Sequence, residues 1–225
     1  MLLRARFPLA IRSHEATYET MYGSFRRATH RNTTFEQARF EVSGHRWADM
    51  SEPGYGVSLL NNGKYGHAAH DNVLSLSLLR GPMYPDWLAD EGEHHFTYAL
   101  YPHPGDWTES DVIAEAQALN SPLVSLPAAA DVTDSAGFVT VDGTELALGA
   151  LKPAFDGNGL ILRVYEPHGR RGPVRFTFTS PVRAVTRVDL LEEPADGAEI
   201  NLGSDGATAS TVIRPFEILT LRLTP

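Results

Sequence analysis

Apolar and polar residues alternate one by one along much of this chain, and this pattern limits the folds open to it. In residues 73–79, Leu74, Leu76 and Leu78 are separated by Ser75 and Ser77. Successive side chains of a strand point to opposite faces, so such alternation predicts strands with one buried face. Residues 174–179, Val-Arg-Phe-Thr-Phe-Thr, repeat the pattern in the second half of the chain. The sequence therefore predicts a mainly β protein.

Turn-forming residues divide the alternating segments into strands of ordinary length. The expected strands lie in residues 2–11, 14–27, 35–47, 57–60, 73–79, 94–101, 160–165, 174–179, 182–191 and 216–223. The short strands of the second half, with turn signals between them, are typical of a small sandwich. The first strand begins at Leu2 with no start signal before it, which favours a piece of a larger protein.

One helix is expected, near residues 109–119. Thr108 and Asp111 have the Thr-x-x-acid form of a capping box, and Val112, Ala116 and Leu119 then form one apolar stripe. Residues 122–136 change to Pro, Ala, Asp and Ser, the composition of a linker. We therefore expect two β units, at residues 1–125 and 137–225.

Residues 45–66, HRWADMSEPGYGVSLLNNGKYG, carry the highest density of groups that could bind a sugar. Asn61-Asn62-Gly63 contains the strongest short hairpin signal, so a tight turn and a second strand near Lys64 and Tyr65 are expected. Aromatic faces can stack on a pyranose while polar neighbours hold its hydroxyls. The candidate sugar contacts are Arg46, Trp47, Asp49, Tyr55, Asn61, Lys64, Tyr65 and Arg80. The alternative is that these residues have structural roles, the aromatic rings in a core and the acidic residues in turns.

Composition and charge exclude several classes of function. The formal net charge of −9 argues against nucleic acid, whose phosphates would be repelled. No run approaches the roughly 20 apolar residues that a membrane span needs. The chain has no cysteine, so it offers neither a disulfide framework nor thiolate chemistry. No signal-peptide pattern is present at the start, and the cytoplasm is the expected compartment.

No metal site is expected within the chain. His94 and His95 are adjacent in an expected strand, so they face opposite sides and cannot chelate one ion together. His67 and His70 could share a helical face, but no third ligand follows at a sensible spacing. The carboxylate candidates are Asp49, Glu52, Asp86, Asp90 and Glu91. A retaining glycosidase needs two carboxyl groups about 5–5.5 Å apart, and turn roles are the alternative for all five.

Several long blocks occur in one order: residues 45–66, then LSLLRGPMYPD, then ADEGEHHFTYALYPH. THRNTTFEQARFEVSGHRWAD upstream, and GLILRVYEPHG and RPFEILTLRL downstream, fit the same series. Together they resemble the C-terminal region of the family 38 glycoside hydrolases, the α-mannosidases, and specifically the cytosolic and bacterial branch. The resemblance covers nearly the whole chain. One departure is Glu93, where the family commonly has a basic residue.

The resemblance implies a fold for this chain and places the catalytic residues outside it. Residues 1–125 would be part of a large, galactose-mutarotase-like β-supersandwich, and residues 137–225 a smaller C-terminal β-sandwich. Enzymes of the family are zinc-dependent retaining α-mannosidases, with the zinc ligands and the Asp nucleophile in an N-terminal barrel that no stretch here resembles. By this resemblance the chain holds no catalytic residue and no cofactor, and zinc belongs to the whole enzyme.

The expected partners follow from the same resemblance: the N-terminal catalytic barrel of the same polypeptide and a mannoside substrate, with the 45–66 segment at the cleft edge. A surface that the barrel covers would be apolar, so we expect an exposed patch around Trp47, Tyr55 and Tyr65. A homo-oligomer would bury that patch. The alternative function is a free-standing carbohydrate-binding or interaction module.

Overall fold

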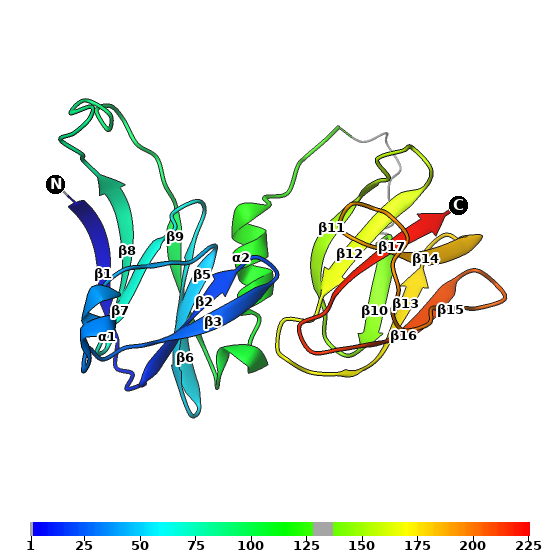
Figure 1. Cartoon of the computed structure of the whole chain (residues 1–225), viewed down its shortest axis with the longest axis horizontal. Helices are drawn as coiled ribbons and strands as arrows, with labels where there is room; N and C mark the ends of the chain where they lie inside the picture. Colours follow the sequence, from blue (N-terminus) through cyan, green and yellow to red (C-terminus); the bar gives the residue numbers. More distant parts are fainter. Residues whose placement is uncertain (1, 128–136) are drawn as a thin grey trace. The chain divides into compact units, whose positions relative to one another are not determined.

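The computed structural model describes residues 2–127 and 137–225, and it divides the chain into two compact units. The first unit is Met1–Val124 and the second is Ser125–Pro225 (Figure 1). Strands dominate both units, so the predicted mainly β class is confirmed. Residues 128–136 of the predicted linker lie outside the described residues. Among the helices that the structure describes, none is long and apolar enough to cross a membrane.

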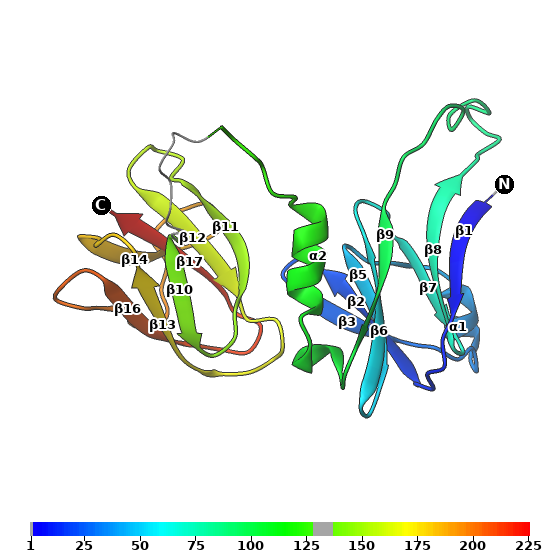
Figure 2. The same ribbon diagram turned by 180° about the vertical axis from the view of Figure 1, so that it is seen from behind.

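Two antiparallel sheets build the first unit. One has the order β1-β8-β7-β4 and the other the order β3-β2-β5-β6-β9. The strands of the first sheet are β1 (Leu2–Pro8), β4 (Val42–Ser43), β7 (Gly66–His70) and β8 (Val73–Arg80). Those of the second are β2 (Glu15–Thr20), β3 (Gly23–Ala28), β5 (Trp47–Glu52), β6 (Tyr55–Asn61) and β9 (Tyr98–His103). The 81–97 connection from β8 to β9 extends beyond both sheets in the two views (Figure 1, Figure 2).

The main core of the first unit lies between these two sheets. Leu74, Leu76 and Leu78 of β8 pack with Val57 and Leu59 of β6. The leucines that alternate with serines in the sequence are therefore the ones that the sheet buries, as the period of two requires. This packing confirms the strand predicted at residues 73–79.

The opposite face of the second sheet carries the helical segment. It comprises the 3₁₀ turn η1 (Trp107–Glu109) and the helix α2 (Val112–Asn120). Val112 and Ala116 of α2 are buried against Trp47 and Leu60 of the sheet. The predicted apolar stripe is thus confirmed. The predicted capping box is wrong, because Asp106 caps η1 through the backbone N–H of Thr108 instead.

The predicted hairpin turn is in the wrong place. β5 and β6 form the hairpin, and their turn contains Pro53 and Gly54, whose φ of 90° favours glycine. At Asn61–Gly63 the chain instead leaves the second sheet and enters β7 of the first, where it pairs with β8 and β4. Asn and Gly supply the same backbone conformations to a hairpin and to a crossover, so turn chemistry alone does not distinguish them.

Several expected strands differ in the structure, and residues 14–27 form two paired strands, β2 and β3, instead of one. Most of residues 35–47 is not strand, because α1 (Thr34–Ala38) occupies its start and only β4 pairs before β5 begins. A complete capping box starts α1: Thr33 accepts from Glu36 N, and the Glu36 side chain accepts from Thr33 N. The strand expected at residues 94–101 begins four residues later, at Tyr98.

The second unit is a sandwich of two four-stranded antiparallel sheets. Their orders are β10-β13-β16-β15 and β11-β12-β17-β14. The strands are β10 (Val139–Gly143), β11 (Ala147–Pro153), β12 (Leu160–Tyr165), β13 (Gly172–Phe178), β14 (Ala184–Val188), β15 (Asn201–Leu202), β16 (Thr208–Ile213) and β17 (Ile218–Thr224). Phe176 and Phe178 of one sheet and Leu219 and Leu221 of the other share one core. The alternation in residues 174–179 marks that buried face.

Candidate functional site

The eight predicted sugar contacts do not gather at one place. Tyr55 begins β6 and Asn61 ends it, so the two residues lie about 20 Å apart at roughly 3.4 Å per residue. Arg80 ends β8 in the other sheet. The 45–66 segment therefore spans the whole sheet instead of forming one loop at a cleft.

Arg46 is bound by side chains of the first unit, Glu19 and Gln117. Its backbone N–H donates to Glu19 Oε2 at 2.8 Å, and its Nε donates to both carboxylate oxygens of Glu19 at 3.0 Å. Its Nη1 also donates to Gln117 Oε1 on α2. Glu19 is buried in β2, so its charge is compensated within the fold by this forked pair. Arg46 joins β2, the start of β5 and α2.

Trp47 is a core residue, with 1% of its surface exposed. Its ring lies against that of Trp107, with centroids 4.8 Å apart and planes tilted by 40°. The expected exposed patch around Trp47, Tyr55 and Tyr65 is therefore wrong for Trp47. The face on which Trp47 lies is covered by η1 and α2, which follow about 60 residues later in the chain.

Asp49 is the centre of a buried polar network. Its Oδ2 lies 2.8 Å from His103 Nε2 and accepts from Ser58 Oγ at 2.7 Å, while Oδ1 accepts from Ser51 Oγ at 2.5 Å. Burial lowers the pKa of His103, but the hydrogen bond and the charge of Asp49 outweigh it and raise that pKa overall. The Asp49 and His103 side chains are 1% and 0% exposed. In this chain their chemistry is that of a structural ion pair, out of reach of a sugar.

Asn61 fixes the crossover between the two sheets. Its Oδ1 accepts from Gly63 N at 3.0 Å and Lys64 N at 2.6 Å, and its Nδ2 donates to His45 O at 2.8 Å. His67, buried beside it in β7, lies with Nε2 3.3 Å from the same carbonyl. Its Nδ1 is buried without a hydrogen-bond partner. Desolvation therefore lowers the pKa of His67 to about 4.

Four of the predicted contacts remain at the surface. Tyr55 is 41% exposed at the hairpin tip, and Tyr65 is 59% exposed with its ring edge-on to His45 at 5.7 Å. Lys64 places its Nζ 4.9 Å from the centroid of the Phe96 ring, and Arg80 is exposed at the end of β8. These four residues can contact another molecule. Lys64 and Tyr65 are adjacent in the chain, whereas Tyr55 begins β6 and Arg80 ends β8.

Two hollows in the first unit were not predicted from the sequence. The larger, of about 820 Å³, is bounded mainly by the loop of residues 9–14 together with Thr29, His30, Asp71 and Asn72. The smaller, of about 320 Å³, is lined by Thr20, Phe25, Arg27, Arg39, Val42, Ser43 and His45. In both cases the lining residues come from separate elements and share no motif, so only the folded chain brings them together.

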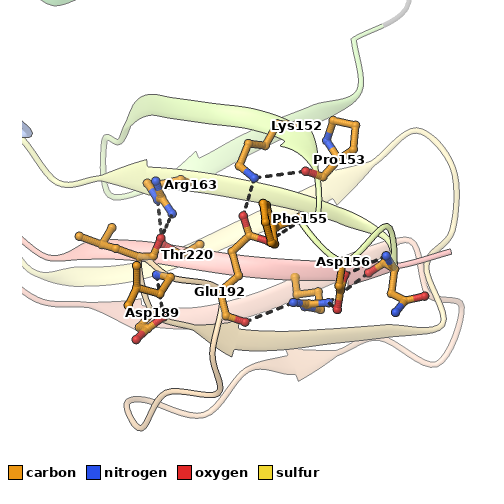
Figure 3. Close-up of polar contacts among 12 residues, drawn as sticks. Lys152, Pro153, Phe155, Asp156, Arg163, Asp189, Glu192 and Thr220 are labelled. Carbon is orange, nitrogen blue, oxygen red and sulfur yellow. Dashed lines mark hydrogen bonds and ion pairs between the residues drawn. The ribbon is translucent and has the colours of Figure 1, made fainter.

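The second unit carries a polar network around Glu192 (Figure 3). Glu192 Oε1 pairs with Lys152 Nζ, and Oε2 accepts from Phe155 N at 2.7 Å. Arg222 donates to Glu192 O at 3.2 Å and to Asp156 Oδ2 at 2.7 Å. The hydrogen bonds from Lys152 and from Phe155 N lower the pKa of Glu192. These contacts join the turn after β11 to β17 and to the segment after β14.

The described residues do not fit a zinc site. Across residues 2–127 and 137–225, no three His, Asp or Glu side chains lie close enough together to share a metal ion. His67 and His70, the pair that could share a helical face, are both in β7 and not on a helix.

Two family models match this chain in sequence order. Residues 1–87 match the glycosyl hydrolases family 38 C-terminal domain, and residues 145–221 match the glycosyl hydrolases family 38 C-terminal beta sandwich domain. This chain is a C-terminal region of glycosyl hydrolase family 38. The resemblance noted in the sequence is thereby confirmed.

Relatives of this family 38 region are much longer than the chain itself. Alpha-mannosidase 2C1 from Homo sapiens is 41% identical over 226 residues, which cover 98% of this chain and 21% of the relative. Alpha-mannosidase G from Dictyostelium discoideum is 37% identical over 230 residues, with 98% and 21% covered. The chain thus spans about a fifth of the length of these relatives. A crystal structure of an alpha-mannosidase from Enterococcus faecalis V583 has the same fold over 98% of this chain and 25% of its own, with a TM-score of 0.77 and 22% identity.

Proposed function

We propose that this chain is the C-terminal β region of an α-mannosidase and that the catalytic barrel is a separate part of the same polypeptide. The observation that carries the proposal is the 41% identity to human Alpha-mannosidase 2C1 across 98% of this chain, which accounts for only 21% of that relative. The whole enzyme would hydrolyse α-mannosides with retention and with zinc. The zinc ligands would come from outside this chain, since the described residues offer no cluster for them.

The role of the chain in that enzyme would be mainly that of a scaffold. Arg46 and Trp47 hold α2 against the second sheet of the first unit, and Asp49 binds His103 of β9 within that sheet. The cleft-edge role therefore passes to those candidates that reach the surface, of which Tyr55 and Tyr65 present aromatic faces. We also propose a cytoplasmic location, in keeping with a sequence that has no cysteine to oxidise.

Activity measurements on two proteins test the proposal. We expect the 225-residue chain alone not to hydrolyse an aryl α-mannoside, with or without added zinc, because a retaining mechanism needs a positioned nucleophile and a paired acid. A longer polypeptide that includes the upstream coding sequence should hydrolyse the same substrate. Turnover by the isolated chain that a single Asp or Glu substitution abolishes would overturn the proposal. Tight mannoside binding by the isolated chain, with an inactive longer polypeptide, would favour the free-standing carbohydrate-binding module.

A further inference from the structure

The smaller hollow of the first unit has an unusual lining for an acidic chain. Arg27, Arg39 and His45 are among the residues that line it. Thr20 and Ser43 add hydroxyl groups, and no carboxylate is among the lining residues. The chain as a whole has a net charge of −9. Two arginines thus line one hollow that has no carboxylate in its lining, although the chain as a whole is acidic.

Arg27 is positioned before any ligand arrives. Its Cζ lies 4.5 Å from the centroid of the Phe25 ring, and its Nη1 donates to Arg26 O at 3.0 Å. Phe25 in turn stacks on the buried ring of Tyr18, with centroids 5.6 Å apart and planes 23° apart. Among the described residues no carboxylate pairs with Arg27. Its remaining N–H groups are thus available in a fixed orientation.

Arg39 reaches the same hollow from a different element. It is the C-cap residue of α1, and its backbone N–H donates to the carbonyls of Phe35 and Glu36. The capping box at Thr33 and Glu36 fixes where α1 begins, and so where Arg39 lies. Within the part of the chain that the structure describes, the guanidinium of Arg39 has no acidic partner.

The nearest buried carboxylate does not neutralise these cations. Glu19 is adjacent to Thr20, but its carboxylate accepts three hydrogen bonds from the backbone N–H and Nε of Arg46. Its carbonyl accepts from His45 N at 2.9 Å and so holds the His45 backbone at the hollow. Glu19 therefore positions the His45 backbone, while its carboxylate is paired with Arg46.

We propose that this hollow binds a small ligand that carries a carboxylate or phosphate group. Two forked guanidinium groups match the paired oxygens of such an anion, and a rigid fork loses little freedom when it binds. The hydroxyls of Thr20 and Ser43 would hold further oxygens of the ligand. A volume of about 320 Å³ suits a small molecule, at the lower end of typical ligand sites. Binding here is independent of mannoside hydrolysis.

Amide chemical shifts of the full 225-residue chain test this site. Titrations with inorganic phosphate and, separately, with malonate distinguish the two kinds of anion, with sodium chloride at matched ionic strength as the blank. We expect saturable shifts confined to residues 20–27 and 39–45 for at least one of the two anions. The stronger binder identifies the anion class. Shifts that spread over both units and follow ionic strength alone would overturn the proposal.

Three variants complete the test. The double variant Arg27→Gln and Arg39→Gln should bind about tenfold more weakly or worse, because it removes both charged donors. Arg27→Lys keeps the charge but not the fork, so it should fold as the parent does and bind several-fold more weakly. Arg175→Gln removes an exposed arginine of the second unit and should leave binding unchanged. Unchanged affinity in the double variant would overturn the proposal.

Discussion

His103 Nε2 lies 2.8 Å from Asp49 Oδ2, although β9 and β5, which carry the two residues, are not neighbours in the sheet. β6 lies between them, and the pair passes over Gly56 of that strand. A Cβ on Gly56 would lie 2.2 Å from His103 Cε1 and 2.4 Å from Ser51 Oγ. The absence of a side chain at residue 56 is thus what allows the pair to form.

Replacing Gly56 with alanine should disrupt that pair. The added methyl group overlaps His103 and Ser51, and overpacking of a buried site costs roughly 1–3 kcal/mol of the free energy of unfolding. Urea denaturation at pH 7 measures the loss. The control is Gly23→Ala in β3, where no atom lies within 4 Å of the new Cβ, and it should be neutral or slightly stabilising. Equal stabilities of the two variants would contradict the steric argument.

Replacing Asp49 with alanine should be more damaging. It leaves the buried His103 and Ser58 and the half-buried Ser51 without their shared acceptor, and removing one partner of a buried ion pair costs about 3–5 kcal/mol. The same urea measurement at pH 7 checks this value. Asp142→Ala, at an exposed position in β10, is the matched control and should change stability by no more than about 0.5 kcal/mol.

His67 should make the first unit sensitive to acid. Its pKa is about 4 in the folded chain and about 6.5 in the unfolded chain, so between these values only the unfolded state binds the proton. Stability should therefore fall as the pH is lowered from about 6.5 to about 4, by about 3 kcal/mol in total for this group.

Unfolding free energies at pH 7 and pH 4.5 measure the effect. His67→Gln should reduce the difference between the two pH values, since glutamine does not titrate. His14→Gln, at an exposed histidine, should keep the full difference. If both variants behave like the parent chain, then burial of His67 is not the cause of the acid sensitivity.

Trp107→Ala should loosen α2. The substitution removes the ring that lies 4.8 Å from that of Trp47, and deletion of a buried tryptophan costs about 3–5 kcal/mol. Faster amide hydrogen exchange in residues 112–120 would report the loosening. Trp87→Ala, at a ring that is 75% exposed, should leave that exchange unchanged. Protection of α2 that survives the loss of Trp107 would show that its docking depends on other contacts.

Features that depend on residues close together in the sequence could be predicted, and features that depend on residues far apart in the sequence could not. The burial of Leu74, Leu76 and Leu78 follows from a period of two within one strand, and it was predicted correctly. The burial of Trp47 depends on Trp107, and the pairing of Asp49 depends on His103, both more than 50 residues away. Local sequence does not distinguish a cleft residue from a core residue beside a turn, so it does not predict that Trp47 and Asp49 are buried.

The two hollows of the first unit could not be predicted for the same reason, because their lining residues come from separate elements. Arg27 lies in β3 and Arg39 is the C-cap residue of α1, and nothing in the intervening sequence indicates that both line one hollow. The α1 capping box was a readable signal, since Thr33 and Glu36 have the standard spacing. Recognising it would have placed α1 but not the hollow.

The pairing of β1 with β8 also determines how the first unit can fold. Leu2 pairs with Arg80, so β1 has no partner in β8 until about 80 further residues have been synthesised. Loop closure over that separation opposes rapid folding, and the unpaired β1 would meanwhile present a free edge to other chains. During translation a chaperone that covers this edge would prevent such pairing.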